Sequence, residues 1–192
     1  VGSFASAILL YGIALIYGVT GALDFESIRN GFPPGNPLGT IGLALVIVGF
    51  AFKVASVPFH QWAPDVYEGA PTSVTAYMAI TVKVAAFMAL LRLLTQAFGP
   101  VAAGLTDLFW VLAAATIVIG NVMAVIQNNL KRLLAYSSIA HAGYLLIGFA
   151  TGSIESYGAV LFYLLVYVFT ILGAFAVLVA LSEAGHDCDS FD

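Results

Sequence analysis

Four ionisable side chains lie inside apolar stretches of the sequence, where a charge is expensive: Lys53, Lys83, His60 and His141. A lysine at the centre of a membrane-spanning helix costs about 2.5–3.5 kcal/mol, and such residues usually mark an ion or proton path. Lys83 follows Pro71 by about 16 Å of helix, which places it near the middle of a bilayer. A buried ammonium holds its proton less firmly than one in water, so a neighbouring charge can load or unload it. These residues therefore predict proton handling.

Each of these residues also has a purely structural interpretation. A buried lysine can be held by backbone carbonyls or by an acid on a neighbouring helix. A lone buried histidine such as His141 is commonly a hydrogen-bonded core group, although imidazole titrates near neutral pH and can relay protons. We expect an acidic partner for the lysines to come from outside this chain, because four acids are predicted at helix ends: Asp24, Glu26, Asp107 and Glu155. Two further acids, Asp65 and Glu68, are expected near the surface, either solvated or pinning a loop.

The composition restricts the class of protein. Of 192 residues, 61% are hydrophobic and only 8% are charged, whereas soluble domains carry about 25% charged residues. A soluble enzyme and a disordered chain are therefore excluded. A nucleic-acid binder is excluded as well, because it needs a basic face and the chain has six Lys and Arg against ten Asp and Glu.

The single cysteine, Cys188, permits neither an internal disulfide nor a cysteine-ligated iron–sulfur cluster. The run 186–189 combines His, Asp and Cys, but it is too dense and tail-like to predict a metal site. We expect no metal and no cofactor in this chain.

Six apolar stretches predict an all-α membrane protein with about six transmembrane helices. They span residues 4–23, 38–67, 72–98, 106–127, 132–150 and 157–182. About 20 apolar residues cross a bilayer as a helix, and a backbone in lipid must satisfy its own hydrogen bonds. Residues 24–37, rich in Gly, Pro and Asn, predict a surface loop. Because the sequence starts at Val1 and ends in a polar run, we expect it to be a fragment of one polytopic membrane domain.

The second stretch is too long for one straight helix. Its 30 residues would extend about 45 Å, and Pro58 lies inside it. Proline removes an amide donor and pushes away the carbonyl one turn before it. Two interpretations remain open, a simple proline kink and a broken helix whose freed backbone groups face a cavity, as in many transporters.

Two blocks of sequence resemble a known family. Residues 52–72 read FKVASVPFHQWAPDVYEGAPT, and residues 130–144 read LKRLLAYSSIAHAGY. Both are similar to the antiporter-like membrane subunits of NADH–quinone oxidoreductase (respiratory complex I), and among these to the bacterial subunit N family, the counterpart of mitochondrial subunit 2. The distinction from sodium/proton antiporter relatives rests mainly on Gln61 and on Val66-Tyr67-Glu68-Gly69. The resemblance covers essentially the whole chain.

The resemblance implies a fold of about fourteen helices with two inverted five-helix repeats, each containing a broken helix. This chain resembles the sixth to eleventh helices. By position, Lys53 matches the lysine of the first broken helix, Lys83 matches a lysine on the next helix, and Pro58 matches the helix break. His60 and His141 match histidines on or near the family's hydrophilic axis. The family's partner glutamate and its second broken-helix lysine lie outside these residues.

The resemblance also implies a function. The chain is expected to be a proton-translocating membrane-arm subunit, driven by quinone reduction elsewhere in the complex, in a bacterial inner membrane or an equivalent energy-transducing membrane. NADH, FMN, iron–sulfur clusters and quinone would belong to other subunits. Its partners would be other membrane-arm subunits, lipid and protons, with Na⁺ left open. Two alternatives are a subunit of a stand-alone cation/proton (Na⁺/H⁺) antiporter and a structural membrane spacer.

Overall fold

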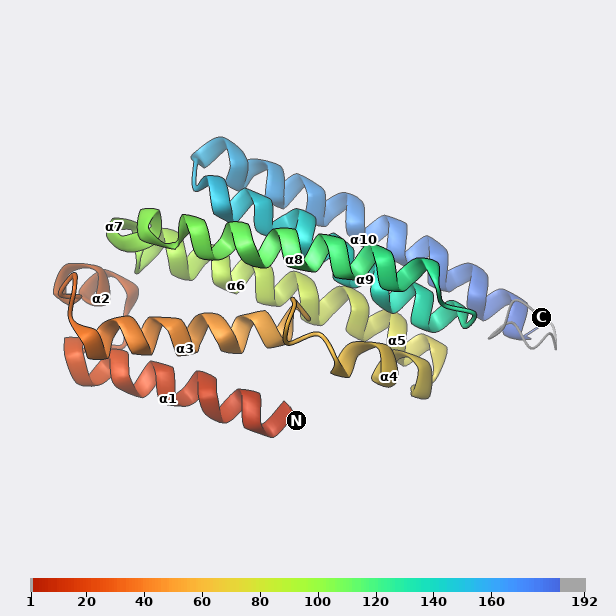
Figure 1. Ribbon diagram of the computed structural model, residues 1–192, viewed down its shortest axis with the longest axis horizontal. Helices are drawn as coiled ribbons and strands as arrows, with labels where there is room; N and C mark the ends of the chain where they lie inside the picture. Colours follow the sequence, from red (N-terminus) through yellow and green to blue (C-terminus); the bar gives the residue numbers. More distant parts are fainter. Residues whose placement is uncertain (1, 184–192) are drawn as a thin grey trace.

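The computed structural model describes residues 2–183. This part of the chain is helical, without a β-strand, and its long helices run close to one common direction (Figure 1). The helices are α1 (Gly2–Thr20), α2 (Phe25–Gly31), α3 (Pro37–Lys53), α4 (Trp62–Gly69), α5 (Thr72–Tyr77), the π-helix η1 (Met78–Val82), α6 (Lys83–Gln96), α7 (Gly99–Ala102), the 3₁₀ turn η2 (Ala103–Leu105), α8 (Thr106–Val125), α9 (Leu130–Thr151) and α10 (Ile154–Glu183).

The described residues confirm the expected all-α membrane architecture. Five helical stretches are long and apolar enough to cross a bilayer: Gly2–Thr20, Thr72–Gln96, Thr106–Val125, Leu130–Thr151 and Ile154–Leu181. The sixth, α3, is shorter and equally apolar. At 17 residues it extends about 26 Å, slightly less than the ~30 Å of a hydrocarbon core.

The predicted helix 38–67 is two helices, so the break itself is confirmed, although two of the freed backbone groups bind protein side chains and do not face a cavity. α3 ends at Lys53, five residues before Pro58, and α4 begins at Trp62. The stretch 72–98 also departs from a regular α-helix, because the five residues of η1 form a π-helix directly before Lys83. A π-turn inside an α-helix is rare and often occurs at a functional site.

The predicted surface loop at 24–37 was wrong in part, because it contains α2. The Asp24 side chain caps this helix by accepting a hydrogen bond from the Ser27 amide at 2.8 Å. That bond lowers the pKa of the Asp24 carboxyl. Ile28 is buried on the inner side of α2. A seven-residue helix gives too few turns for a recognisable apolar period, so only the cap could have indicated it.

Glycine allows the closest helix pairs, α8 with α9 and α1 with α3, to touch through their backbones. A Cβ built on Gly120 would lie 2.7 Å from the Ala140 amide nitrogen, and one on Gly143 would lie 2.8 Å from that of Ile117. Gly12 meets the Gly42 carbonyl oxygen in the same way at 2.7 Å. Small residues serve this purpose in lipid, where close packing replaces the hydrophobic effect between helices.

We predict that Gly120→Ala destabilises the protein by about 1–3 kcal/mol, because the added methyl group meets the backbone of α9 and forces the helices apart. Gly173→Ala in α10 is the control, since nothing lies within 4 Å of its added carbon. The measurement is the thermal unfolding midpoint of the detergent-solubilised protein. An equal midpoint for both variants would refute the close contact.

Candidate functional site

The helix break between Lys53 and Trp62 is an ordered turn held by specific hydrogen bonds. Ala55 adopts a left-handed conformation with φ of +57°, which costs a residue with a Cβ about 1–2 kcal/mol. Hydrogen bonds hold this turn: the Ser56 amide donates to the Ala51 carbonyl at 2.9 Å, and the Val57 amide donates to Thr116 Oγ1 of α8 at 3.0 Å. Because Thr116 is fully buried, the freed amide is satisfied inside the protein.

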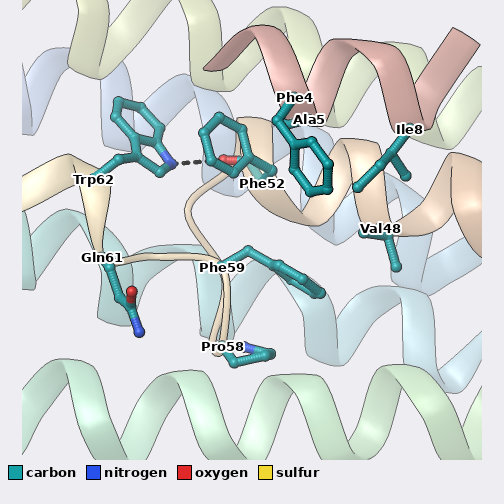
Figure 2. A pocket seen from close by; sticks show the side chains of 9 residues that line it. All are labelled: Phe4, Ala5, Ile8, Val48, Phe52, Pro58, Phe59, Gln61 and Trp62. Atoms are coloured by element: carbon teal, nitrogen blue, oxygen red, sulfur yellow. Dashed lines mark hydrogen bonds between the residues drawn. The ribbon is translucent and has the colours of Figure 1, made fainter. Parts of the chain in front are cut away.

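The far end of the break is fixed by an indole. Trp62 Nε1 donates to the Phe52 carbonyl at 3.0 Å, and the two rings stack with their centroids 5.5 Å apart (Figure 2). The pocket drawn there, about 170 Å³, lies between α1 and the break and is mostly apolar. Gln61 points away from Phe4 and Ile8 in that view. This pocket offers no group for proton chemistry.

A second and larger cavity, about 580 Å³, brings Lys53 and Lys83 together. Lys53 is the last residue of α3, and Lys83 is the first of α6. The cavity is lined by Gly2, Phe52, Lys53, Ala55, Trp62, Asp65, Val66, Tyr67, Met78, Val82 and Lys83. The two lysines that the sequence singled out therefore face one space, although they are 30 residues apart in the chain.

The two lysines have different surroundings. Lys83 is 3% exposed, whereas Lys53 is only half-buried and makes no hydrogen bond to a described residue. The sequence places both lysines inside apolar stretches, and the structure buries Lys83 but buries Lys53 only in part. Asp65 also lines the cavity, which the sequence did not indicate, but its carboxylate binds Arg132 at 2.7 Å and not a lysine.

The Lys83 ammonium is bound by α9. It donates to both the carbonyl oxygen and the hydroxyl of Ser138. The Ser138 hydroxyl lies 2.7 Å from the Tyr167 hydroxyl of α10, which donates to the Ala79 carbonyl of η1 at 3.1 Å. Lys83 also lies 5.7 Å from the centre of the Tyr167 ring, within range of a cation–π interaction. The hydrogen-bonded chain thus begins at Lys83 and ends on the π-helix that precedes it.

His141 forms a second polar pair next to this chain. It lies one turn after Ser138 on α9, and its Nδ1 is 2.6 Å from the Tyr163 hydroxyl. Its ring is 5.4 Å from the Tyr167 ring, centre to centre. His141 and Lys83 are therefore neighbours around Tyr167, and no direct hydrogen bond joins the two clusters among the described residues.

His60, like His141, lies outside the lining of the cavity shared by the lysines, and no contact of its side chain with the other candidates is seen among the described residues. It belongs to the turn before α4 and is half-buried. Its Nδ1 and the Ser56 hydroxyl are buried without a hydrogen-bond partner in the part of the chain that the structure describes. Buried polar groups of this kind usually carry water.

Sequence reasoning missed Tyr163 and Tyr167, which hold His141 and Ser138. Their four-residue spacing places both on one face of α10, but tyrosine is so common at membrane interfaces that the spacing gave no signal. Residues 2–183 contain no group of three or more His, Cys, Asp or Glu side chains placed to bind a metal. The run 186–189 and Cys188 lie outside the described residues.

Comparison with known proteins gives consistent results. The family model described as NADH:quinone oxidoreductase/Mrp antiporter, TM, matches residues 1–192. NADH-quinone oxidoreductase subunit N of Magnetococcus marinus is 53% identical over 187 residues, covering 96% of this chain and 39% of that protein. The chain thus spans about two fifths of this curated relative. The resemblance found in the sequence is confirmed.

Two solved complexes contain a similar chain. One is respiratory complex I from Thermus thermophilus with bound aureothin, with 48% identity and a TM-score of 0.77 over 92% of this chain and 38% of the other. The second is the Mrp complex from Dietzia sp., with 30% identity and a TM-score of 0.87 over 94% of this chain and 33% of the other. Fold and sequence therefore agree on one group of multi-pass membrane proteins.

We predict that Tyr167→Phe destabilises the protein by about 1–3 kcal/mol, because the change removes the hydroxyl that bridges Ser138 and the Ala79 carbonyl in a buried site. Tyr77→Phe is the matched control, since Tyr77 is 65% exposed. Thermal unfolding in detergent measures the difference. Equal midpoints for the two variants would contradict the buried bridge.

Proposed function

The chain belongs to the NADH:quinone oxidoreductase/Mrp antiporter transmembrane family, and on that premise we propose that it is part of a proton-translocating membrane-arm subunit of an NADH–quinone oxidoreductase. The observation that carries the proposal is a buried lysine, Lys83, with hydroxyl and carbonyl acceptors on one side and a cavity shared with Lys53 on the other. The names of the more similar relatives support the same assignment.

In this proposal Lys83 is the group that takes up and releases a proton. The Ser138 hydroxyl can accept a hydrogen bond from the ammonium and can rotate to donate one to the neutral amine. A proton arriving at Lys53 places a second positive charge on the same cavity, and the repulsion favours release from Lys83. Water in the cavity would carry the proton between the two nitrogens, and Tyr167, Tyr163 and His141 would continue the polar path.

The chain itself performs no redox chemistry in this proposal. NADH, FMN, iron–sulfur clusters and quinone would be held by other subunits, and the charge shift that follows quinone reduction would reach Lys53 through the membrane arm. The acidic partner of Lys53 would come from outside this chain, since the one described carboxylate on its cavity, Asp65, is bound to Arg132. The complex would lie in a bacterial inner membrane or an equivalent energy-transducing membrane.

Two alternatives make different demands on the same site. A stand-alone cation/proton antiporter is favoured by the likeness to the Mrp complex, but the higher identity to the oxidoreductase subunits argues for the first assignment. A structural spacer requires both lysines to be held by carbonyls. Lys83 does bind the Ser138 carbonyl, whereas Lys53 binds no carbonyl of a described residue and faces a cavity.

We predict that Lys83→Met in the intact complex, reconstituted in vesicles, lowers the number of protons pumped per NADH oxidised, because the amine that holds the proton is gone. The number of protons pumped per NADH should fall by about a third or more of the wild-type value. Arg92→Met is the control: this cation lies on the same helical stretch, over the Phe25 ring at 5.3 Å, far from the cavity lining. An undiminished ratio in an assembled Lys83→Met complex would overturn the proposal.

We also predict that affinity purification of the full-length subunit from native membranes recovers peripheral subunits with iron–sulfur clusters. Their electron paramagnetic resonance signals are the readout. Recovery of cation-antiporter subunits with no iron–sulfur signal, together with Na⁺-dependent proton movement in vesicles, would support the antiporter alternative instead.

A further inference from the structure

Arg132 of α9 binds two acids of the short helix that follows the break. Its Nη1 lies 2.7 Å from an Asp65 oxygen and 2.8 Å from a Glu68 oxygen. Its Nε donates to the Gln127 side chain at 3.3 Å. The Asn129 side chain accepts a hydrogen bond from the Arg132 amide at 3.0 Å, so the residue is fixed at both its backbone and its side chain.

Two of these three charges, those of Glu68 and Arg132, are poorly placed within their own helices. Glu68 lies one residue before the end of α4, where the helix dipole disfavours an anion, and Arg132 lies in the first turn of α9, where it disfavours a cation. Asp65 and Glu68 are also three residues apart on one helix face, where like charges repel. The contact between the two helices offsets the unfavourable positions of Glu68 and Arg132.

The helix α4 depends on such outside contacts. It has eight residues, too few to be stable alone. Its start is held by the Trp62 bond to the Phe52 carbonyl, and its end by the Thr75 hydroxyl, which donates to the Tyr67 carbonyl at 3.0 Å. α4 also packs against α9, and Arg132 of α9 supplies the polar link between the two helices.

This link joins a helix that lines the cavity to the helix that holds Lys83. α4 contributes Trp62, Val66 and Tyr67 to the cavity shared by the lysines, whereas α9 does not line it but carries Ser138, which accepts hydrogen bonds from Lys83. Ser138 lies less than two turns after Arg132 on the same helix. The distance between α4 and α9 therefore determines the position of the α4 residues that line the cavity relative to the Lys83 ammonium.

We propose that Arg132 is a positioning residue for proton transfer: by binding Asp65 and Glu68 together, it holds α4 against α9 and keeps the cavity between Lys53 and Lys83 in its working shape. The consequence for pumping rests on the proposed function, but the effect on α4 does not. Arginine suits this task because one planar guanidinium serves several acceptors, while a lysine ammonium is a single point charge.

The test uses the intact complex in vesicles and compares Arg132→Gln with Arg92→Gln, an arginine whose partners are the nearby Gln96 and the Phe25 ring. Two readouts are taken together: hydrogen exchange of the backbone amides 62–69, and protons pumped per NADH oxidised. For Arg132→Gln we expect exchange of these amides to rise by about tenfold or more, exchange in α10 to stay unchanged, and the pumping ratio to fall. Arg92→Gln should change neither readout.

A cycle of variants distinguishes positioning from a direct effect of the charge. The double variant Asp65→Asn with Glu68→Gln should reproduce Arg132→Gln, and the triple variant should be no worse than either, because all of them remove the same link. Arg132→Lys keeps the charge and should change both readouts less than Arg132→Gln does. It also replaces Arg132→Gln in the test if that variant fails to assemble.

Each other outcome overturns the proposal. A lower pumping ratio with unchanged exchange in 62–69 would mean that Arg132 acts through its charge. Faster exchange with an unchanged ratio would mean that the link only supports α4, and additive losses in the triple variant would mean that the acids act separately. If Lys83→Met leaves the ratio intact, the proposed function fails, and the exchange result still decides whether Arg132 fixes α4.

Discussion

A protonated amine inside an apolar helix bundle must have hydrogen-bond acceptors, and the arrangement around Lys83 follows from that need. An unpaired buried charge costs several kcal/mol, a large part of the about 5–15 kcal/mol by which folded proteins are stable. Here Ser138 presents two oxygens to the ammonium, and Tyr167 passes the hydrogen bond on to the Ala79 carbonyl. Three helical segments, η1, α9 and α10, are thereby tied to one side chain.

Backbone irregularities supply the polar groups that a regular helix would use for itself. The π-helix η1 precedes Lys83 and offers the Ala79 carbonyl to Tyr167. The break after Lys53 frees amides and carbonyls, and the side chains of the buried Thr116 and the half-buried Trp62 bind two of them. In lipid every backbone group must find a partner, so irregular backbone is tolerated here because its partners are inside the protein. Both irregularities occur beside a lysine that faces the cavity.

The long helices, the interruption around Pro58 and the burial of Lys83 were predictable, because each rests on a local quantity: apolar length, a missing amide donor and a charge within an apolar run. α2 and η1 were not, since one is too short to show a period and the other depends on packing against α10. Pro58 indicates that the helix is interrupted, but it does not determine the backbone path of the break. That path decides how far Lys53 is exposed and places His60 outside the cavity lining. The contact of Tyr167 with Ser138 was not predictable, because it depends on how α9 and α10 pack against each other.

The proposed proton path requires that the cavity shared by Lys53 and Lys83 is hydrated, and that water joins the Lys83–Ser138–Tyr167 chain to the neighbouring His141. A density map of the intact complex that resolves ordered water tests this most directly. We expect water molecules bridging Lys53 Nζ and Lys83 Nζ, with further water within hydrogen-bond distance of the His141 ring. A cavity filled by lipid chains or apolar side chains, with both lysines bound only to backbone carbonyls, would contradict it.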